Sequence, residues 1–227
     1  MHLLLLIILL LALVVGPSLW VNAVMSRYRL PRDRYQKTGG ELARELLDAA
    51  GLHDVRTETT EAGDHYDPVH KVLRLSSANY NERSLTAVTV AAHEVGHALQ
   101  DAQAFGPLRW RTRLIQWVRP VEKVGAVMLM ASPFAGAVAR APALGLLTFL
   151  GGILTLGSAV VVHALTLPAE FDASFVRALP LLERRRVLRP EDKGRARRLL
   201  TAAALTYVSG ALQSLLNVAR WWRILRR

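Results

Sequence analysis

The stretch AAHEVGHALQ, residues 91–100, holds two histidines four residues apart, with a glutamate directly after the first. Residues four apart on an α-helix project from one face, with their β-carbons about 5–6 Å apart. His93 and His97 can therefore offer two nitrogens to one metal ion. Glu94 projects about 100° around the helix from His93, and in such sites the glutamate does not bind the metal but takes a proton from the attacking water.

The neighbouring residues predict that this motif is buried in a helix. Ser84 is a suitable N-cap for a helix running from about Leu85 to Gln103, and that helix is apolar on nearly every side. Two histidines on an exposed helix face are the alternative, which the apolar neighbours argue against. Gly96 costs a helix about 1 kcal/mol relative to Ala, so another part of the chain is expected to pack closely there.

The set of metal ligands is limited by composition. The chain has no cysteine, so a thiolate zinc site is excluded and any metal must be held by His, Asp or Glu. A catalytic zinc usually takes three protein ligands and one water. An extended H-E-x-x-H-x-x-G-x-x-H motif would supply the third ligand locally, but this chain has Gln100 and Gln103 at its last two positions. The remaining candidates are Glu122, His65, Asp67, Asp101, His163 and Glu170.

The apolar residues, 52% of the chain, gather into long runs. Leu3–Val24 carries no charge and is long enough to cross a hydrocarbon core of about 30 Å, so it is predicted to be a transmembrane helix. A cleaved signal peptide is the alternative, although no basic segment precedes the run. Val124–Ala139 and Ala141–Leu167 predict a transmembrane hairpin. Leu199–Ala219 is more polar and predicts a fourth membrane helix, which either spans or is re-entrant.

The net charge of +11 is concentrated at the ends of these runs. Arg27, Arg29, Arg32 and Arg34 follow the first run, Arg109, Arg111, Arg113, Arg119 and Lys123 precede the second, and Arg184, Arg185, Arg186 and Arg189 follow the third. This positive-inside pattern predicts a multi-pass protein of the cell membrane whose metal site faces the cytoplasm. A lipid bilayer is the expected partner and nucleic acid is not. The tail RWWRILRR conflicts with a spanning fourth run, unless it lies flat as an interfacial anchor.

Residues 27–120 predict one small cytoplasmic domain. TGGELARELLDAAGL, residues 38–52, has a capped start and an amphipathic pattern, and is predicted to be a helix. VRTET and KVLRLS alternate well enough to be strands, with GDHYDP as a turn between them. Further on, Pro168 can open a helix that carries Glu170. Glu170 also follows the His pair by two predicted membrane crossings and is therefore expected on the same side.

Several segments resemble one known family. AAHEVGHALQ followed by PAEFDAS is similar to the YugP-like bacterial membrane zinc metallopeptidases, and more distantly to the HtpX and CAAX prenyl protease group. GGELARELLDAAGL, GDHYDP with KVLRLS, and AALTYV also resemble that family, so the likeness covers nearly the whole chain. The resemblance implies a gluzincin-type zinc endopeptidase acting on protein or peptide substrates. One Zn²⁺ per chain would be bound by His93, His97 and Glu170, with Glu94 as the catalytic base.

The outer contacts of the metal site are where the chain departs from the HtpX pattern. That pattern has an Asp four residues after the glutamate, able to orient a ligand histidine, whereas this chain has Ser174. Asp172 is expected about 200° around the helix from Glu170, pointing away. Ser174 is therefore the candidate for orienting a histidine.

Four other residues can be interpreted either as part of a functional site or as purely structural. His65 and Asp67 either line a substrate cleft or form a polar turn. His163 lies in an apolar run and is either functional or hydrogen-bonded to a neighbouring helix. Tyr207 either donates to a developing oxyanion or packs as an ordinary aromatic residue.

These observations together predict a mainly α multipass membrane protein, with three or four transmembrane helices and a small α+β zincin-like domain carrying the HExxH helix. The expected segments are a transmembrane helix at 1–26, the cytoplasmic domain at 27–120, a transmembrane hairpin at 121–167, a helix with the third ligand and a basic segment at 168–198, and a membrane helix with a basic tail at 199–227. The alternatives to a membrane metalloendopeptidase are a non-catalytic zinc-binding membrane scaffold and a metal-free lipid-binding membrane protein.

Overall fold

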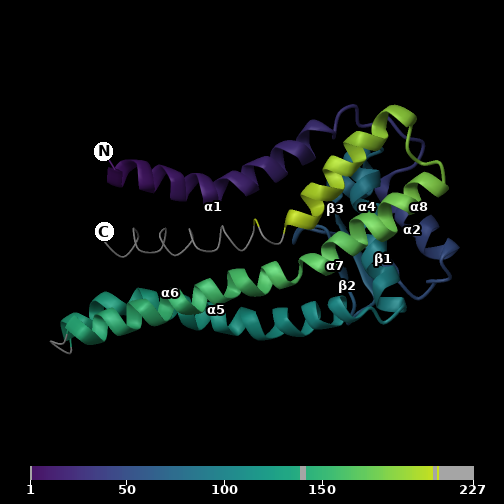
Figure 1. Cartoon of the computed structure of the whole chain (residues 1–227). Coiled ribbons are helices and arrows are strands. Elements are labelled where there is room, and N and C mark those ends of the chain that lie inside the picture. Colours follow the sequence, from purple (N-terminus) through teal and green to yellow (C-terminus); the bar gives the residue numbers. More distant parts are fainter. Residues whose placement is uncertain (1, 139–141, 207–208, 210–227) are drawn as a thin grey trace. The chain divides into compact units, whose positions relative to one another are not determined.

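The computed structural model describes residues 2–138, 142–206 and 209 (Figure 1). The chain divides into two compact units. The first, here called the helical unit, includes Met1–Ser18 and Trp110–Thr166, and the second, the mixed unit, is formed by Leu19–Arg109 and Leu167–Thr206. The elements are α1 (His2–Arg27), α2 (Gly39–Ala49), β1 (Arg56–Thr60), β2 (His65–Asp67), β3 (Val72–Ser76), α3 (Ser77–Asn81), α4 (Leu85–Ala102), α5 (Gly106–Val138), α6 (Pro142–Leu165), α7 (Leu167–Phe171), the π-helix η1 (Asp172–Ala178), α8 (Leu179–Arg184) and the 3₁₀ turn η2 (Pro190–Asp192). Residues 193–206 are also helical.

Helix α2 forms where the sequence predicts it. The Thr38 hydroxyl accepts from the Glu41 backbone N–H, and the Glu41 carboxylate accepts from the Thr38 N–H, which completes a capping box. Its apolar face buries Leu42, Leu46 and Leu47 in the core of the mixed unit. The amphipathic pattern and the cap therefore determine both the start and the orientation of α2.

The sheet has three strands in the order β1-β3-β2. β1 is parallel to β3, and β2 is antiparallel to it, with Tyr66 paired to Leu73. The prediction of strands at VRTET and KVLRLS is confirmed by β1 and β3. The GDHYDP turn is only partly right, because its central residues form β2. The short run HYD offers a single apolar residue, so the periodicity could not show the strand.

Helix α4 is the centre of the mixed unit. It begins after the N-cap Ser84, as predicted, and packs against α2, α3, α8, η1 and the sheet. Leu199 and Leu200, in the helical stretch 193–206, are fully buried in the same core. The first residues of the run expected to be a fourth membrane helix therefore belong to this core. Most of the rest of that run, and the basic tail, lie outside the described residues.

The expected multipass membrane architecture is wrong. Among the described residues, no helix combines the length and the apolarity needed to cross a bilayer. The second apolar run is shorter than the roughly 20 residues that a spanning helix needs. It forms the later part of α5, which begins at Gly106 and includes the basic residues expected to flank the run. The cytoplasmic orientation was derived from membrane-crossing runs and loses its basis with them.

The helical hairpin predicted from the second and third apolar runs is present as α5 and α6. α5 and α6 lie side by side in the helical unit and run in opposite directions (Figure 1). A Cβ built on Gly151 of α6 would lie 2.6 Å from the terminal carbon of Met128 in α5. Glycine therefore permits close packing of these two helices.

A buried carboxylate joins the two chain segments of the mixed unit. Asp192 in η2 is fully buried and accepts from Arg34 Nε and Nη2 at 2.6 and 2.9 Å, from the Tyr35 hydroxyl at 2.7 Å, and from Arg195 Nη1 at 2.9 Å. Burial opposes ionisation of Asp192, but these hydrogen bonds outweigh it and hold the pKa of the carboxyl below its usual range. Asp192 is therefore ionised, and its negative charge stabilises the fold through the arginines that it binds.

We expect Asp192→Asn to lower the free energy of unfolding at neutral pH by about 3 kcal/mol, because it leaves Arg34 without its buried counter-ion. A carboxyl whose folded-state pKa is depressed stabilises the fold above its unfolded pKa of about 3.9 and loses this effect as pH falls through the folded value. The gap between variant and parent should thus narrow only below about pH 4. Urea unfolding at several pH values measures it. Glu191→Gln, which removes the exposed partner of the same arginine, is the control and should change the midpoint little.

Candidate metal centre

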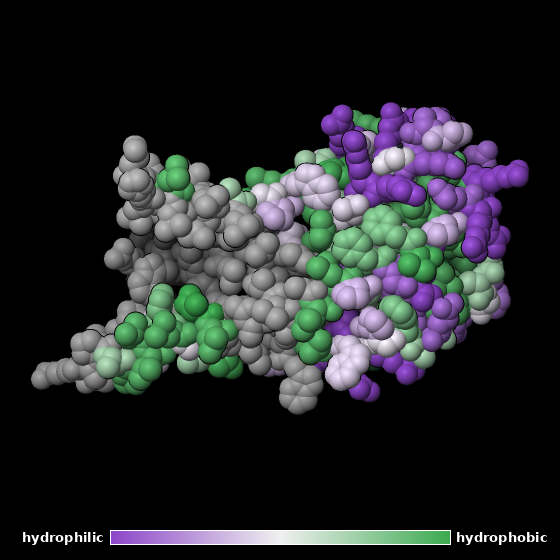
Figure 2. Space-filling model, in the orientation of Figure 1, coloured by the Kyte–Doolittle hydropathy of each residue, from purple (hydrophilic) through white to green (hydrophobic). Residues whose placement is uncertain are grey.

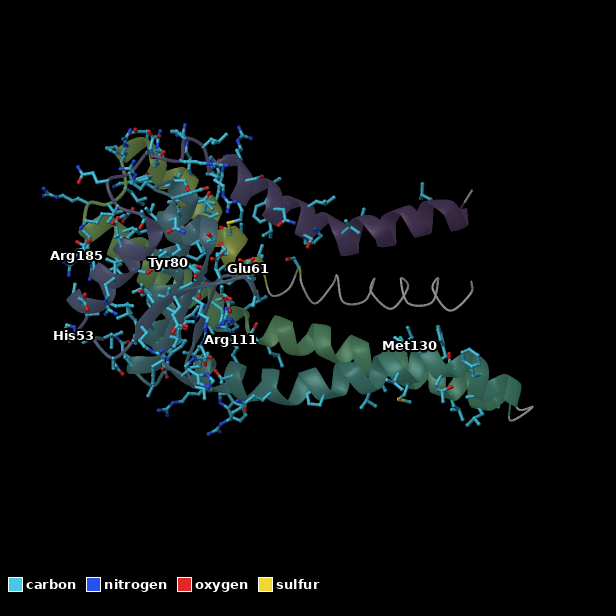
Figure 3. The ribbon with its side chains drawn as sticks, turned by 180° about the vertical axis from the view of Figure 1, so that it is seen from behind. His53, Glu61, Tyr80, Arg111, Met130 and Arg185 are labelled. Atoms are coloured by element: carbon cyan, nitrogen blue, oxygen red, sulfur yellow. The ribbon has the colours of Figure 1, made fainter. Side chains whose placement is uncertain are left out.

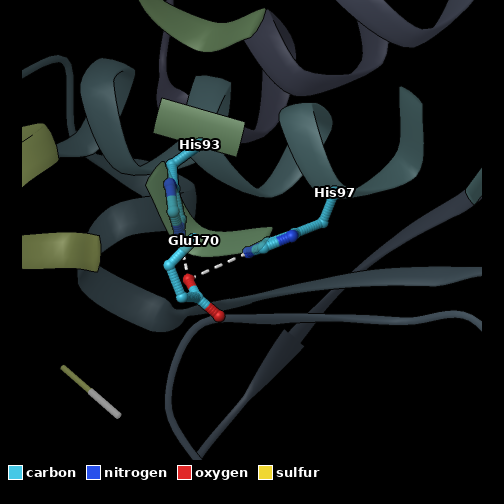
Figure 4. Close-up of side chains that lie close together, drawn as sticks. All are labelled: His93, His97 and Glu170. Carbon is cyan, nitrogen blue, oxygen red and sulfur yellow. Dashed lines mark hydrogen bonds and ion pairs between the residues drawn. The ribbon is translucent and has the colours of Figure 1, made fainter. Parts of the chain in front are cut away.

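Helices α4 and α7 bring His93, His97 and Glu170 together (Figure 4). The Nε2 atoms of His93 and His97 lie 3.3 and 3.2 Å from the same oxygen, Glu170 Oε2. The two imidazole rings are 4.7 Å apart and nearly perpendicular. All three side chains are buried, with Glu170 fully enclosed. The geometry thus places two nitrogens and one oxygen around a single point.

These distances fit a zinc ion. With metal–ligand bonds of about 2.1 Å and tetrahedral angles, neighbouring ligand atoms lie about 3.4 Å apart. The distances from Glu170 Oε2 to the two imidazole nitrogens agree with this value. Imidazole and carboxylate ligands are also the set that catalytic zinc sites use when cysteine is absent.

Gln100 fixes the ring state of His97. Its side-chain NH₂ donates to the Ala169 carbonyl and to Asp172 Oδ1, both at 2.7 Å, so the amide orientation is determined. Its Oε1, 2.9 Å from His97 Nδ1, must then accept the Nδ1–H. The Nε2 of a neutral His97 consequently carries a lone pair directed at the Glu170 side chain.

Ser174 does the same for His93. Its hydroxyl donates to the Leu200 carbonyl at 3.1 Å and has only one proton, so it accepts from His93 Nδ1, 3.0 Å away. The contact that the orienting role requires is therefore present. In their neutral state both histidines direct an Nε2 lone pair at one carboxylate oxygen, which is the arrangement of a metal-ligand set.

Asp172 takes part in the hydrogen bonds around the metal centre through Gln100. Its Oδ1 accepts from Gln100 Nε2 and from Arg177 Nε at 2.7 and 2.6 Å. Arg177 also donates to Gln103 and stacks over the Phe105 ring. Sequence reasoning missed this chain of contacts from Arg177 through Asp172 and Gln100 to His97, and the only signal for it was Gln100 one turn after His97.

The glycine in the motif permits the close approach of α4 to η1, the π-helix that directly follows Glu170. A Cβ built on Gly96 would lie 2.6 Å from the carbonyl oxygen of Ala173 in η1. The close packing expected from Gly96 is thus confirmed, and its partner is backbone, which cannot rotate away as a side chain could. Glu94, the next residue after His93, is also buried.

The polar-turn reading accounts for the contacts of Asp67. Its carboxylate binds His70 and Arg74, and accepts from the backbone N–H groups of Val69 and His70. Burial works against its ionisation, but these hydrogen bonds hold the pKa of Asp67 below its usual range. His65 Nδ1 contacts the Gly63 carbonyl at 2.8 Å. Both residues lie in β2 and neither belongs to the His93, His97 and Glu170 cluster.

The other candidates do not join the cluster either. Asp101 binds the Tyr66 hydroxyl and Lys71, which ties the end of α4 to the sheet. The side chains of Glu122 and His163 lie outside the part that the structure describes, and Tyr207 lies outside the described residues.

Comparison with known proteins gives two matches. A family model described as "Putative neutral zinc metallopeptidase" matches residues 3–226. The chain is also 36% identical over 213 residues to a protein of Bacillus subtilis (strain 168) named "Putative membrane protease YugP", and the alignment covers 91% of this chain and 90% of that protein. No solved structure matches.

We expect Gly96→Ala to destabilise the fold by about 1–3 kcal/mol, because its methyl group would overlap the Ala173 carbonyl. The control is Gly194→Ala, another helical glycine, around which a Cβ would meet nothing within 4 Å. That change should stabilise by up to about 1 kcal/mol. Chemical unfolding measures both, and equal effects would contradict the packing argument.

We expect Gln100→Leu to weaken zinc binding about 10- to 100-fold while the chain stays folded, because His97 would lose the acceptor that fixes its ring. Gln103→Leu makes the same chemical change three residues later, where the side chain contacts Arg177 and no ligand. Competition with a chromophoric chelator measures both affinities, and circular dichroism monitors the fold. An unchanged affinity in Gln100→Leu would show that the amide does not position His97.

Proposed function

This chain belongs to the family described as putative neutral zinc metallopeptidases, and we propose that it hydrolyses peptide bonds at the centre formed by His93, His97 and Glu170. The observation that supports this most is the convergence of both Nε2 atoms on one Glu170 oxygen, with each Nδ1 engaged by Gln100 or Ser174. One zinc ion per chain is part of the proposal.

In the proposed reaction, peptide hydrolysis depends on one bound zinc ion and one general base. Zinc, when bound, supplies Lewis-acid polarisation of the scissile carbonyl and lowers the pKa of water toward 7. His93 and His97 stay neutral ligands because their Nδ1–H groups are held by Ser174 and Gln100. Burial of the cluster excludes bulk water and strengthens the electrostatic interactions within it.

Glu94 is the proposed general base. It follows His93 on α4 and is 5% exposed. In this role its carboxylate accepts a proton from the attacking water and passes it to the leaving amine. A non-catalytic zinc scaffold is the second candidate, because the same three ligands could serve a structural site. A structural site has no use for a buried carboxylate such as Glu94 next to its first ligand, which favours the enzyme.

The proposed substrates are proteins or peptides associated with a membrane, and the proposed location is the lipid surface. Support comes from the name of the Bacillus subtilis relative, "Putative membrane protease YugP".

We expect Glu94→Gln to retain zinc and fold but to lose about 10² to 10⁴ in turnover, since glutamine keeps the size and polarity of the side chain and cannot accept the proton. Turnover is measured on a membrane-associated substrate or by self-cleavage, and zinc content by atomic absorption. Glu183→Gln, on the exposed end of α8, is the matched control and should retain full turnover.

A second variant separates the ligand from the base. Glu170→Gln should lose zinc affinity as well as turnover, because it replaces the proposed carboxylate ligand with a neutral amide. If Glu94→Gln processes the substrate as fast as the parent protein, the proposed mechanism is wrong and the non-catalytic zinc scaffold becomes the preferred function. If Glu170→Gln keeps its zinc, the third ligand has been misassigned.

A further inference from the structure

A pocket of about 340 Å³ lies in the mixed unit. Its lining includes Arg185, Arg186 and Arg189, three of the four arginines that were expected to flank the third apolar run at the membrane. Its walls come from the segment before α2, from α2 and α4, and from the segment after α8. The cationic lining residues are Arg34, Lys37, Arg185, Arg186 and Arg189, against a single acid, Glu45. Leu42 and Val88 add apolar surface. Hydrophilic side chains crowd the surface of this unit in Figure 2, and Figure 3 places Arg185 at its edge.

The charges of this pocket are only partly neutralised by the protein. Lys37 is paired with Glu45, and Arg34 with Asp192. Among the ion pairs of the described residues none involves Arg185, Arg186 or Arg189. Arg189 donates to the backbone carbonyl of Arg34 at 2.8 Å, which holds its guanidinium at the pocket wall. Three guanidinium groups therefore keep their charge available to a ligand.

Arg186 occupies a backbone position that favours glycine. Its φ is 52°, in the left-handed region. The Arg186 and Val187 N–H groups donate to the carbonyls of Glu183 and Leu182, both at 3.0 Å, which is the Schellman end of a helix. Glycine is the usual residue there because any side chain is disfavoured at positive φ. This helix end places the Arg186 side chain in the lining of the pocket.

We propose that this pocket binds a phosphate-bearing ligand through Arg185, Arg186 and Arg189. Guanidinium groups match phosphate oxygens with paired hydrogen bonds, and they keep their charge at any physiological pH. The volume suits a small ligand, and the apolar surface at Leu42 and Val88 can contact the part that carries no charge. Val88 lies on α4 about 140° around the helix from His93, so this pocket is distinct from the metal centre.

The test measures phosphate binding by the full-length protein at constant ionic strength, with inorganic phosphate and glycerol phosphate as probes. Arg185→Gln and Arg186→Gly should each weaken binding about tenfold or more. Arg186→Gly should at the same time keep or raise the melting temperature, because it relieves the left-handed arginine, so weaker binding cannot be ascribed to misfolding. Arg184→Gln, in the same run but outside the pocket lining, should bind as the parent does.

A second arm identifies the source of the phosphate group. Vesicles of phosphatidylcholine with and without phosphatidic acid are sedimented with the parent and the three variants. Selective loss of vesicle binding in Arg185→Gln and Arg186→Gly supports a lipid headgroup, and selective loss with the soluble probes alone supports a free phosphate ester. Equal affinity in all variants, an equal loss in Arg184→Gln, or no binding of any probe would overturn the proposal.

Discussion

Helix α4, which carries His93 and His97, meets the π-helix that directly follows Glu170 through backbone, at Gly96 of α4 and Ala173 of η1. Any side chain at Gly96 would separate them, and the carboxylate of Glu170 would then no longer lie beside both imidazoles. The three-residue cluster depends on this contact because its members lie on different elements. The HExxH motif thus carries, besides its histidines and glutamate, the glycine that allows the third ligand to approach.

Around that contact the polar groups determine one another. Arg177 holds Asp172, Asp172 holds the Gln100 amide, and the amide decides which nitrogen of His97 carries the proton. A network of this kind has few alternatives in a buried site, since reversing the amide would turn its oxygen toward the Ala169 carbonyl and the Asp172 carboxylate, both of which are acceptors. Ser174, whose hydroxyl donates to the Leu200 carbonyl, determines in the same way that Nδ1 of His93 carries the proton. The ring states required for metal binding are therefore set by neutral groups and one ion pair at the edge of the cluster.

Local patterns in the sequence were sufficient for α2, α4, β1 and β3, because each has a cap or a clear periodicity. The cluster of His93, His97 and Glu170 also followed, from helical spacing and a family resemblance. The contact of Asp172 with Gln100 was missed because the two residues lie 72 positions apart in the chain. The membrane architecture was wrong: apolar runs with basic flanks predicted membrane spans, whereas no helix among the described residues has the length and apolarity to cross a bilayer. Contacts such as Asp192 with Arg34, far apart in the chain, leave no local pattern.

The sequence distance between the two halves of the metal centre has a consequence during synthesis. Glu170 is 73 residues after His97, and all of α5 and α6 lie between them. At about 5–20 residues per second, α4 leaves the ribosome roughly 4–15 s before its covering segment exists. Throughout that interval the face around Gly96 has no η1 to pack on, and exposed apolar surface of this kind is prone to aggregate. Because α4 precedes η1 by so many residues, the nascent chain exposes the apolar face of α4 and is prone to aggregate until η1 has been made. Shielding of α4 by a partner during those seconds would reduce this aggregation.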